Sequence, residues 1–396
     1  MANNKGNGFV LNSDTISGVM MILAGLAAVI ASNVPVIGNY YNHFIGYVIP
    51  VKIGHILIAD TVKQWTQDAL MVLFFLNVTL ELKVELYEGV LSDRRQVLLP
   101  LVAAVGGMLV PAIIYLIINW QFPDNLPGAA IPCATDIAFA ICIFNLAGNS
   151  APLAIRIFLL SIAIFDDLGA IVIIAVFYAK SIAFYPLLLT VAGIGGLLLL
   201  NCYKVSALIS YIVITIFIWF GLHEVGIHTT LAGVILGLAI PLHNKTGNHS
   251  PLKSVLKIIN PVSLFLVSPF FAFVACDLSF SGLTVSSLFN PIAFGIFLGL
   301  FLGKQIGIFG STWLLIKCKF VSMPKGGNWF YVYFVSCLAG IGFTMSLFMG
   351  ELAFADDHLQ DLVKTGIICA SIASALWGAF VMKGMASPKI TPAKVV

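Results

Sequence analysis

Two adjacent aspartates, Asp166 and Asp167, lie in the middle of the apolar segment SIAIFDDLGAIVIIAVF. A charged side chain at the centre of a bilayer costs about 2.5–3.5 kcal/mol on insertion scales, and such residues mark ion pathways and proton relays. Carboxylate oxygens suit small hard cations, and a carboxylate also binds protons. The pair therefore predicts a site at which protons and a metal cation compete, which is the chemistry of a cation–proton exchanger.

Other polar residues and glycines interrupt apolar segments elsewhere. They are Thr135 and Asp136 in PCATDIAFA, Lys304 in FLGLFLGKQIGI, and Gly340 and Gly342 in CLAGIGFTMSLF. Closely spaced glycines weaken a helix interior, and breaks at matching places in two spans of a transporter point to its binding site. In a broken helix, Asp136 would neutralise positive half-helix N-termini and Lys304 negative C-termini.

The composition is that of a membrane protein. Of the 396 residues, 60% are hydrophobic and 9% are charged, whereas a soluble domain carries about a quarter charged residues. The net charge of +3 and the lack of a basic run argue against a nucleic-acid partner. The seven cysteines are scattered singly, without CxxC spacing, so we expect neither a disulfide framework nor a resident metal or cofactor.

Apolar runs of membrane-spanning length predict an all-α polytopic protein with twelve transmembrane helices. The predicted spans are 15–34, 67–87, 97–119, 131–147, 152–178, 183–202, 206–221, 226–241, 258–276, 291–316, 329–352 and 361–383. Short loops join them, so residues 1–396 form a single transporter domain that begins with a cytoplasmic tail at 1–14.

The basic residues predict the orientation of the chain. With the N-terminus inside, most of the 20 lysines and arginines lie in cytoplasmic segments. The outer segments then contain only Lys52, Lys63, Lys180 and Lys364. Because the number of spans is even, both termini are expected in the cytoplasm.

The first outer loop has a different pattern. Residues 48–61, VIPVKIGHILIADT, place β-branched residues on both sides of a Gly54-His55 turn, which predicts a small β-hairpin. Because an isolated hairpin is marginally stable in water, we expect it to pair with something, and a partner subunit is a reasonable candidate.

The two interrupted spans occupy matching positions in the chain. Span four is the middle of spans three to five (97–178), and span eleven is the middle of spans ten to twelve (291–383). Units that start at spans three and ten cross the bilayer in opposite senses. An inverted repeat of two three-helix units is therefore topologically available.

Five segments, taken in order, closely resemble the NhaA family of bacterial sodium–proton antiporters. They are ATDIAFA (134–140), FDDLGAIVIIAVFY (165–178), HTTLAGVILG (228–237), LGKQIGI (302–308) and GIGFTMSLF (340–348). The resemblance implies two crossed discontinuous helices, in spans four and eleven, within two inverted three-helix units. It also implies a secondary active transporter, not an enzyme. Such a transporter exchanges one sodium or lithium ion for two protons across the bacterial inner membrane, electrogenically, for sodium and pH homeostasis.

The resemblance also implies roles for the intramembrane polar residues. Asp167 corresponds to the principal acid that binds Na⁺ and protons, Asp166 to its partner at the site, and Lys304 to a lysine that balances charge. Which of the two aspartates Lys304 contacts stays open. The residues assigned to the helix crossing are Thr135, Asp136, Gly340 and Gly342.

Three further residues are candidates for the cytoplasmic funnel and the pH response. Glu81 matches a family glutamate near the funnel, and Glu85 and His228 are the other two candidates. The 48–61 hairpin resembles the element that joins two protomers into a homodimer.

The chain departs from the family pattern at several positions. Asp277 lies in PFFAFVACDLSF, where a FANAG-like pattern is usual, and Gln305 replaces a common proline after Lys304. The glutamates associated with pH response align with Asn244 and Leu256, so that form of sensor is expected to be absent from the loop between spans eight and nine.

Two other classes of protein also use acids in the membrane. An intramembrane aspartyl protease needs carboxylates from different helices around one water, and FDDLG and ATDIA lack its GxGD context. A passive cation channel lines a continuous pore with acidic rings. Broken helices and a lone lysine favour a single midplane site instead.

Overall fold

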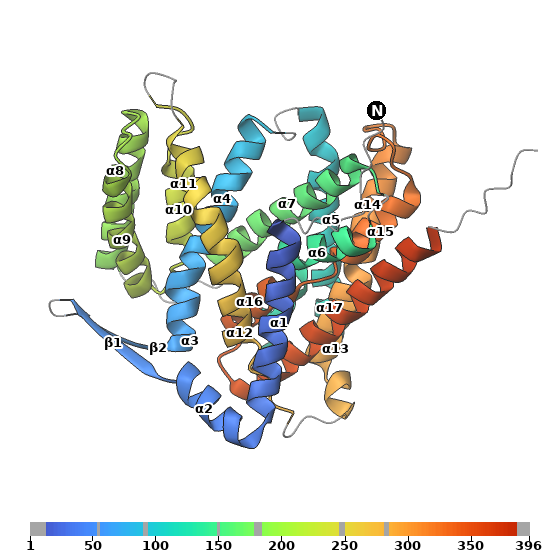
Figure 1. Cartoon of the computed structure of the whole chain (residues 1–396), viewed down its shortest axis with the longest axis horizontal. Coiled ribbons are helices and arrows are strands. Elements are labelled where there is room, and N and C mark those ends of the chain that lie inside the picture. Colours follow the sequence, from blue (N-terminus) through green and yellow to red (C-terminus); the bar gives the residue numbers. More distant parts are fainter. Residues whose placement is uncertain are drawn as a thin grey trace, which may run out of the picture.

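The computed structural model describes residues 13–53, 56–89, 94–148, 151–177, 184–244, 250–280 and 285–385. Within these ranges the protein is helical apart from one two-stranded hairpin (Figure 1). Most of the predicted tail (1–14) and the predicted Gly54-His55 turn lie outside the described residues.

The elements up to residue 177 are α1 (Ser13–Asn33), α2 (Pro35–Ile45), β1 (Val48–Ile53), β2 (Ile56–Thr61), α3 (Val62–Trp65), the π-helix η1 (Thr66–Leu70), α4 (Met71–Tyr87), α5 (Arg94–Asn119), the 3₁₀-helix η3 (Pro123–Cys133), α6 (Ile137–Ala147) and α7 (Leu153–Phe177). The later elements are α8 (Phe184–Cys202), α9 (Leu208–Val225), α10 (Leu231–Ala239), α11 (Pro251–Val262), η4 (Ser263–Val267), α12 (Ser268–Ala275), η5 (Val285–Phe289), α13 (Pro291–Leu298), η6 (Gly299–Gly303), α14 (Lys304–Lys317), α15 (Trp329–Leu338), α16 (Phe343–Ala353) and α17 (Asp357–Met385).

Among the described residues, 8 helices are long and apolar enough to cross a membrane, or up to 10 if each of two bent helix pairs is one span. The bent pairs are η3 with α6, at 47°, and α15 with α16, at 45°. The prediction of broken helices in spans four and eleven is therefore confirmed. The molecule is a multi-pass, all-helical membrane protein. The predicted spans 67–87 and 226–241 correspond to shorter helices, α4 and α10.

The first broken span begins earlier than its apolar pattern indicates. Its first half is the 3₁₀-helix η3, which starts at Pro123 rather than near residue 131. Pro127 and Pro132 lie inside it. Proline removes a backbone donor and disfavours the α conformation of the residue before it, so this segment has no α-helical periodicity to detect.

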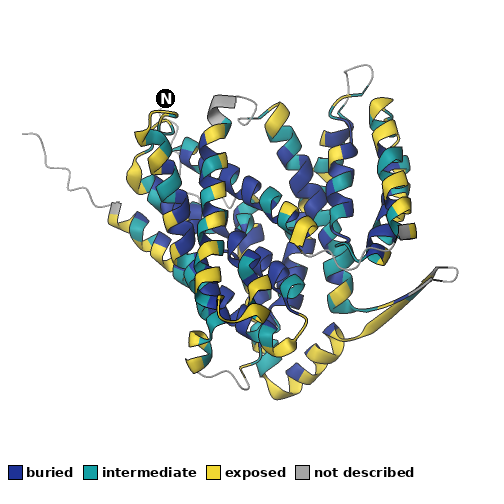
Figure 2. Ribbon diagram, turned by 180° about the vertical axis from the view of Figure 1, so that it is seen from behind, coloured by how far each residue is buried: buried dark blue, intermediate teal, exposed yellow. Residues whose placement is uncertain are grey.

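The helices form two groups, which are visible in Figure 1. One group, here called the panel, contains α3, α4 and α8–α12, in which α10 packs on α4 and α9. The other, the bundle, contains η3, α5–α7 and α13–α17, in which α5 packs on α7 and α14 and α17 packs on α13 and α15. Helix α1 contacts both groups, through α12 and α6. Figure 2 shows that exposed residues cover the outward faces of both groups, as expected of surfaces in contact with lipid.

The predicted hairpin is confirmed. β1 and β2 pair antiparallel, with Val48 opposite Thr61. Thr61 then begins α3, because its hydroxyl accepts a hydrogen bond from the backbone N–H of Gln64 and the Gln64 side chain accepts from the N–H of Thr61. We call the end of the molecule that carries the hairpin the hairpin side, and the end where Ser13 begins α1 the tail side (Figure 1).

Glycines bring two bundle helices into close contact near Lys304. A Cβ added to Gly307 would lie 2.2 Å from the carbonyl oxygen of Gly106, so α14 and α5 approach as closely as only small residues allow. A Cβ at Gly303 would likewise lie 2.8 Å from Cα of Pro111. This close packing of α14 on α5 holds the backbone of Lys304 in place beside the core.

Candidate ion-binding site

The two broken spans contact each other at their breaks. The backbone N–H of Asp136 donates to the carbonyl oxygen of Ile341 (2.7 Å). A Cβ at Gly340 would lie 2.6 Å from the carbonyl oxygen of Leu300 in η6, so the second break packs against η6 as closely as only glycine allows. The extended segments of the two spans thus supply hydrogen-bond partners that no helix provides there.

Asp136 lies at the N-termini of two half-helices. Its Oδ1 accepts a hydrogen bond from the N–H of Phe139 in α6 (3.0 Å). Its Oδ2 accepts from both the N–H (3.1 Å) and the hydroxyl (2.5 Å) of Thr344 in α16. An acid at this position caps both helices and is stabilised by the positive ends of their dipoles.

Lys304 lies at the C-terminal end of a half-helix. Its Nζ donates to the carbonyl oxygen of Cys133 (2.6 Å), the last residue of η3. It also forms an ion pair with Oδ2 of Asp166 at 2.5 Å, and both side chains are fully buried. The π-helical turn η6 ends immediately before Lys304, and such turns often occur at functional sites.

The two aspartates of α7 have different partners. Oδ2 of Asp166 contacts Lys304 and lies 2.7 Å from the hydroxyl of Thr135, which is also 2.8 Å from the carbonyl oxygen of Ala339. Having one hydrogen, this hydroxyl donates to only one of the two at a time. In the described part of the chain, Oδ1 of Asp166 and both carboxylate oxygens of Asp167 have no hydrogen-bond partner. A buried carboxylate without a partner is costly unless it binds a proton or a cation.

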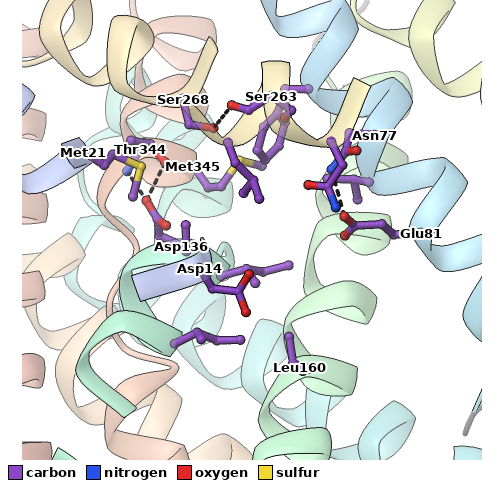
Figure 3. Close-up of a pocket in the computed structure, with 17 residues that line it drawn as sticks. Asp14, Met21, Asn77, Glu81, Asp136, Leu160, Ser263, Ser268, Thr344 and Met345 are labelled. Carbon is purple, nitrogen blue, oxygen red and sulfur yellow. Dashed lines mark hydrogen bonds between the residues drawn. The ribbon is translucent and has the colours of Figure 1, made fainter. Parts of the chain in front are cut away.

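A cavity of about 230 Å³ leads from Asp136 toward the tail side (Figure 3). Asp136, Glu81 and Asp14 line it, and Glu81 accepts a hydrogen bond from the side-chain amide of Asn77 (3.0 Å). Neither Asp166 nor Asp167 lines this cavity. Its three carboxylates would attract cations toward the helix crossing.

Sequence reasoning missed two residues of this cavity. Asp14 was assigned to the tail, but it lies in the first turn of α1 and pairs with Arg156 (2.9 Å). Asn77 is buried within the apolar run of α4. A polar amide in the middle of a predicted span was the signal that could have identified Asn77.

The structure brings Glu81, but not His228, to this cavity. His228 lies before α10, where its Nδ1 is 3.0 Å from the hydroxyl of Thr230 and its Nε2 is 4.0 Å from Oδ1 of Asp68. Asp68 and Glu81 are separated by about 20 Å along one helix, at 1.5 Å per residue. Glu85 follows Glu81 by one turn of α4, toward the tail side.

Glu88, at the end of α4, lies beside the loop between spans eight and nine, whose sequence contains no acidic residue. Glu88, which caps the end of α4, pairs with His243 (Oε1 to Nε2, 3.3 Å) and with the ammonium group of Lys253. The hydrogen bond from Lys253 lowers the pKa of the Glu88 carboxyl. Asn244 is the last described residue before the undescribed residues 245–249, whereas Leu256 lies within α11 and not in a loop, so the predicted loop is shorter than the sequence indicates.

Comparison with known proteins gives a consistent result. The sequence model described as Na+/H+ antiporter 1 matches residues 9–382. The chain is 41% identical over 372 residues to the "Na(+)/H(+) antiporter NhaA" of Shewanella pealeana, covering 93% of this chain and 95% of that protein. It is 42% identical over 372 residues to the "Na(+)/H(+) antiporter NhaA 2" of Saccharophagus degradans (93% and 97%). It is also 42% identical over 376 residues to the NhaA protein of Nitrobacter hamburgensis (94% and 90%).

Proposed function

Because this chain belongs to the Na+/H+ antiporter 1 family, we propose that it exchanges sodium or lithium ions for protons across a membrane, as a secondary active transporter and not an enzyme. The observation that carries the proposal is that, within the described part of the chain, three buried carboxylate oxygens of Asp166 and Asp167 have no hydrogen-bond partner. The channel and protease alternatives have no comparable support in the family or in the geometry.

Asp167 is the principal site at which sodium and protons compete. Both of its carboxylate oxygens are available, whereas Asp166 shares one oxygen with Lys304. A cation bound between the two aspartates would replace the ammonium of Lys304 as the positive partner of Asp166. Together, Asp166, Asp167 and Lys304 offer more than one site for protons, which supports an exchange of two protons for one sodium ion.

Thr135, Asp136, Gly340 and Gly342 shape the crossing beside this site. Asp136 balances the charge of two half-helix N-termini, and Lys304 that of the η3 C-terminus. Asp136 and Lys304 are therefore stabilised by the half-helix ends, and their stability does not depend on a bound sodium ion. They keep the broken helices in place while the ion binds and leaves.

The proposed topology has twelve spans, with α3–α4 and α10 added to the candidates above, inverted units at 97–178 and 291–383, and both termini in the cytoplasm of a bacterial cell. The tail side is then cytoplasmic, and the cavity containing Glu81 is the inner access path. The hairpin at 48–61 lies on the outer side, where it joins two copies into a homodimer.

The function is tested with the purified protein in proteoliposomes. An imposed sodium gradient should drive proton movement, reported by a pH-sensitive dye inside the vesicles. With the membrane potential clamped by potassium and valinomycin, the initial rate should change with voltage, because two protons for one sodium ion move one net charge. A voltage-independent rate would mean electroneutral exchange, and sodium flux without proton movement would mean a channel.

A further inference from the structure

Four charged side chains, from α3, α16, α17 and the segment that follows α12, meet at one place outside the ion-binding site. Nζ of Lys63, on α3, lies 3.3 Å from Oδ2 of Asp277 and 3.2 Å from Oε1 of Glu351, on α16. Lys364, on α17, forms an ion pair with Oδ1 of Asp277 and donates to its backbone carbonyl at 3.3 Å. Because Oδ1 of Asp361 also lies 3.7 Å from Nζ of Lys364, two lysines and three acids form a continuous network, with Lys63, Asp277, Glu351 and Lys364 at its centre.

This network lies on the hairpin side, at the opposite end of the molecule from the cavity. Lys63 comes two residues after the end of β2. Asp277 precedes Leu278, whose carbonyl oxygen accepts hydrogen bonds from Ser32 (2.9 Å) and Asn33 (2.8 Å) at the C-terminal end of α1. The cavity, by contrast, reaches Asp14 at the start of α1.

The network joins the two groups of helices. Lys63 and Asp277 belong to the panel, through α3 and the end of α12, whereas Glu351 and Lys364 belong to the bundle, through α16 and α17. The pairs Lys63–Glu351 and Asp277–Lys364 therefore both cross between panel and bundle. On the tail side the cavity lies between the same two groups.

Aromatic side chains pack between the network and the helix crossing. Phe348 lies between Thr344 and Glu351 on α16, and its ring centroid is 5.6 Å from that of Phe75 and 6.1 Å from that of Phe271. All three rings are buried. The hairpin side is therefore closed by an aromatic layer with an ion-pair layer outside it.

These ion pairs can separate when water enters between panel and bundle. The Glu351 side chain is 5% exposed, and neither of its oxygens has a hydrogen-bond donor among the described residues, so Lys63 provides its charge partner. The Lys63 ammonium lies within ion-pair distance of both Glu351 and Asp277, so one lysine is shared by two acids. Separated in water, both charges regain hydration, which offsets the lost attraction.

We propose that Lys63, Asp277, Glu351 and Lys364 form the outer gate of the transport pathway, which is closed in this structure and must open for the site to face outward. The proposal rests on the antiport function and topology proposed above, because alternating access requires panel and bundle to separate on the hairpin side. Asp277 lies in PFFAFVACDLSF, one of the positions at which this chain departs from the family pattern described above.

Cys276 provides a reporter for this gate, since it is 1% exposed and adjacent to Asp277. The experiment uses the full chain in right-side-out vesicles, with the other cysteines replaced by serine, and measures labelling of Cys276 by a membrane-impermeant maleimide per inserted molecule. With the gate intact, labelling should be slow. Lys63→Met should accelerate it at least about tenfold, because the open state becomes more populated.

Three further variants keep the test interpretable. Lys63→Glu should also accelerate labelling, and combining it with Glu351→Lys, which restores an opposite pair, should slow labelling again. Lys52→Met, which removes an exposed hairpin lysine outside the network, should have no effect. Equal labelling rates in the intact, Lys63→Met and Lys63→Glu proteins would overturn the gate, as would fast labelling of the intact protein. Sodium-driven proton movement in the same vesicles tests the antiport function separately, because labelling does not require transport.

Discussion

Nζ of Lys304 lies 2.5 Å from Oδ2 of Asp166, so the lysine at the helix crossing pairs with the first of the two aspartates, whereas the second has no hydrogen-bond partner among the described residues. Successive residues on a helix point about 100° apart, which separates the two carboxylates. The two acids are therefore chemically different in this structure. Asp166 is part of a charge-balanced network, and Asp167 is available to protons and cations.

The Lys304–Asp166 pair makes a prediction about stability. Lys304→Met leaves Asp166 buried without its cation, so the free energy of unfolding should fall by about 3–5 kcal/mol. Adding Asp166→Asn should recover much of that loss, because the uncompensated charge is gone. Thermal unfolding in detergent measures both effects. Lys317→Met, at the exposed end of the same helix, removes only a contact with the Trp313 ring (4.3 Å to its centroid) and should change stability by no more than about 1 kcal/mol. An equal loss in the single and double variants would contradict the pairing.

Asp136 should stabilise the fold more than an ordinary helix cap. Asp136→Ala removes the acceptor for two half-helix N-termini in a buried place and should cost about 2–3 kcal/mol. Asp356→Ala is the matched control, because Asp356 is exposed and accepts a hydrogen bond from the N–H of Leu359 (3.0 Å); this substitution should cost about 1 kcal/mol. The difference between the two thermal unfolding midpoints measures the effect. Equal losses would mean that Asp136 caps only one helix.

Much of this site follows from the sequence because charges in apolar segments are conspicuous. Asp136, Asp166, Asp167 and Lys304 were identified in this way, and the glycines of the second break predicted where α15 ends. The partner of Lys304 was not predictable, because it depends on the rotation of α7 relative to α14.

The roles of charged residues near the ends of spans are harder to recognise from the sequence. Lys63, Asp277 and Glu351 each look like an ordinary interfacial charge, and only the fold brings them together. The 3₁₀-helix η3 was missed because its prolines remove the α-helical periodicity on which the prediction relied.

Competition between protons and sodium predicts the dependence of transport on pH. At lower pH, protons occupy Asp166 and Asp167 for more of the time, so the apparent KM for sodium should rise, by up to about tenfold per pH unit for each competing proton. The maximal rate should change little. Rates measured against pH at several sodium concentrations test this. A steep fall in the maximal rate at saturating sodium would instead indicate a separate sensor, with Glu81, Glu85, His243 and His249 as the first residues to substitute.

Glu88 should not act as that sensor. Its pKa is lowered by the hydrogen bond from Lys253, so the pairing is present above the ordinary pKa of glutamate and is lost only as the pH falls through the lower, folded-state value. Glu88 therefore stays ionised throughout the neutral and alkaline range. Glu88→Gln should leave the midpoint of the rate–pH profile unchanged. A shift of that midpoint by about one pH unit or more would show that Glu88 or its partner His243 titrates in the working range.

The most direct test of the account is sodium-driven proton movement in proteoliposomes that contain Asp167→Asn. Asparagine has nearly the same shape but neither ionises nor carries a transported proton, so the variant should insert normally and show no exchange above that of empty vesicles. Asp124→Asn, which changes an exposed acid outside the site, should transport at the rate of the unmodified protein. Full sodium–proton exchange by Asp167→Asn would contradict the assignment of Asp167 as the residue at which the two ions compete.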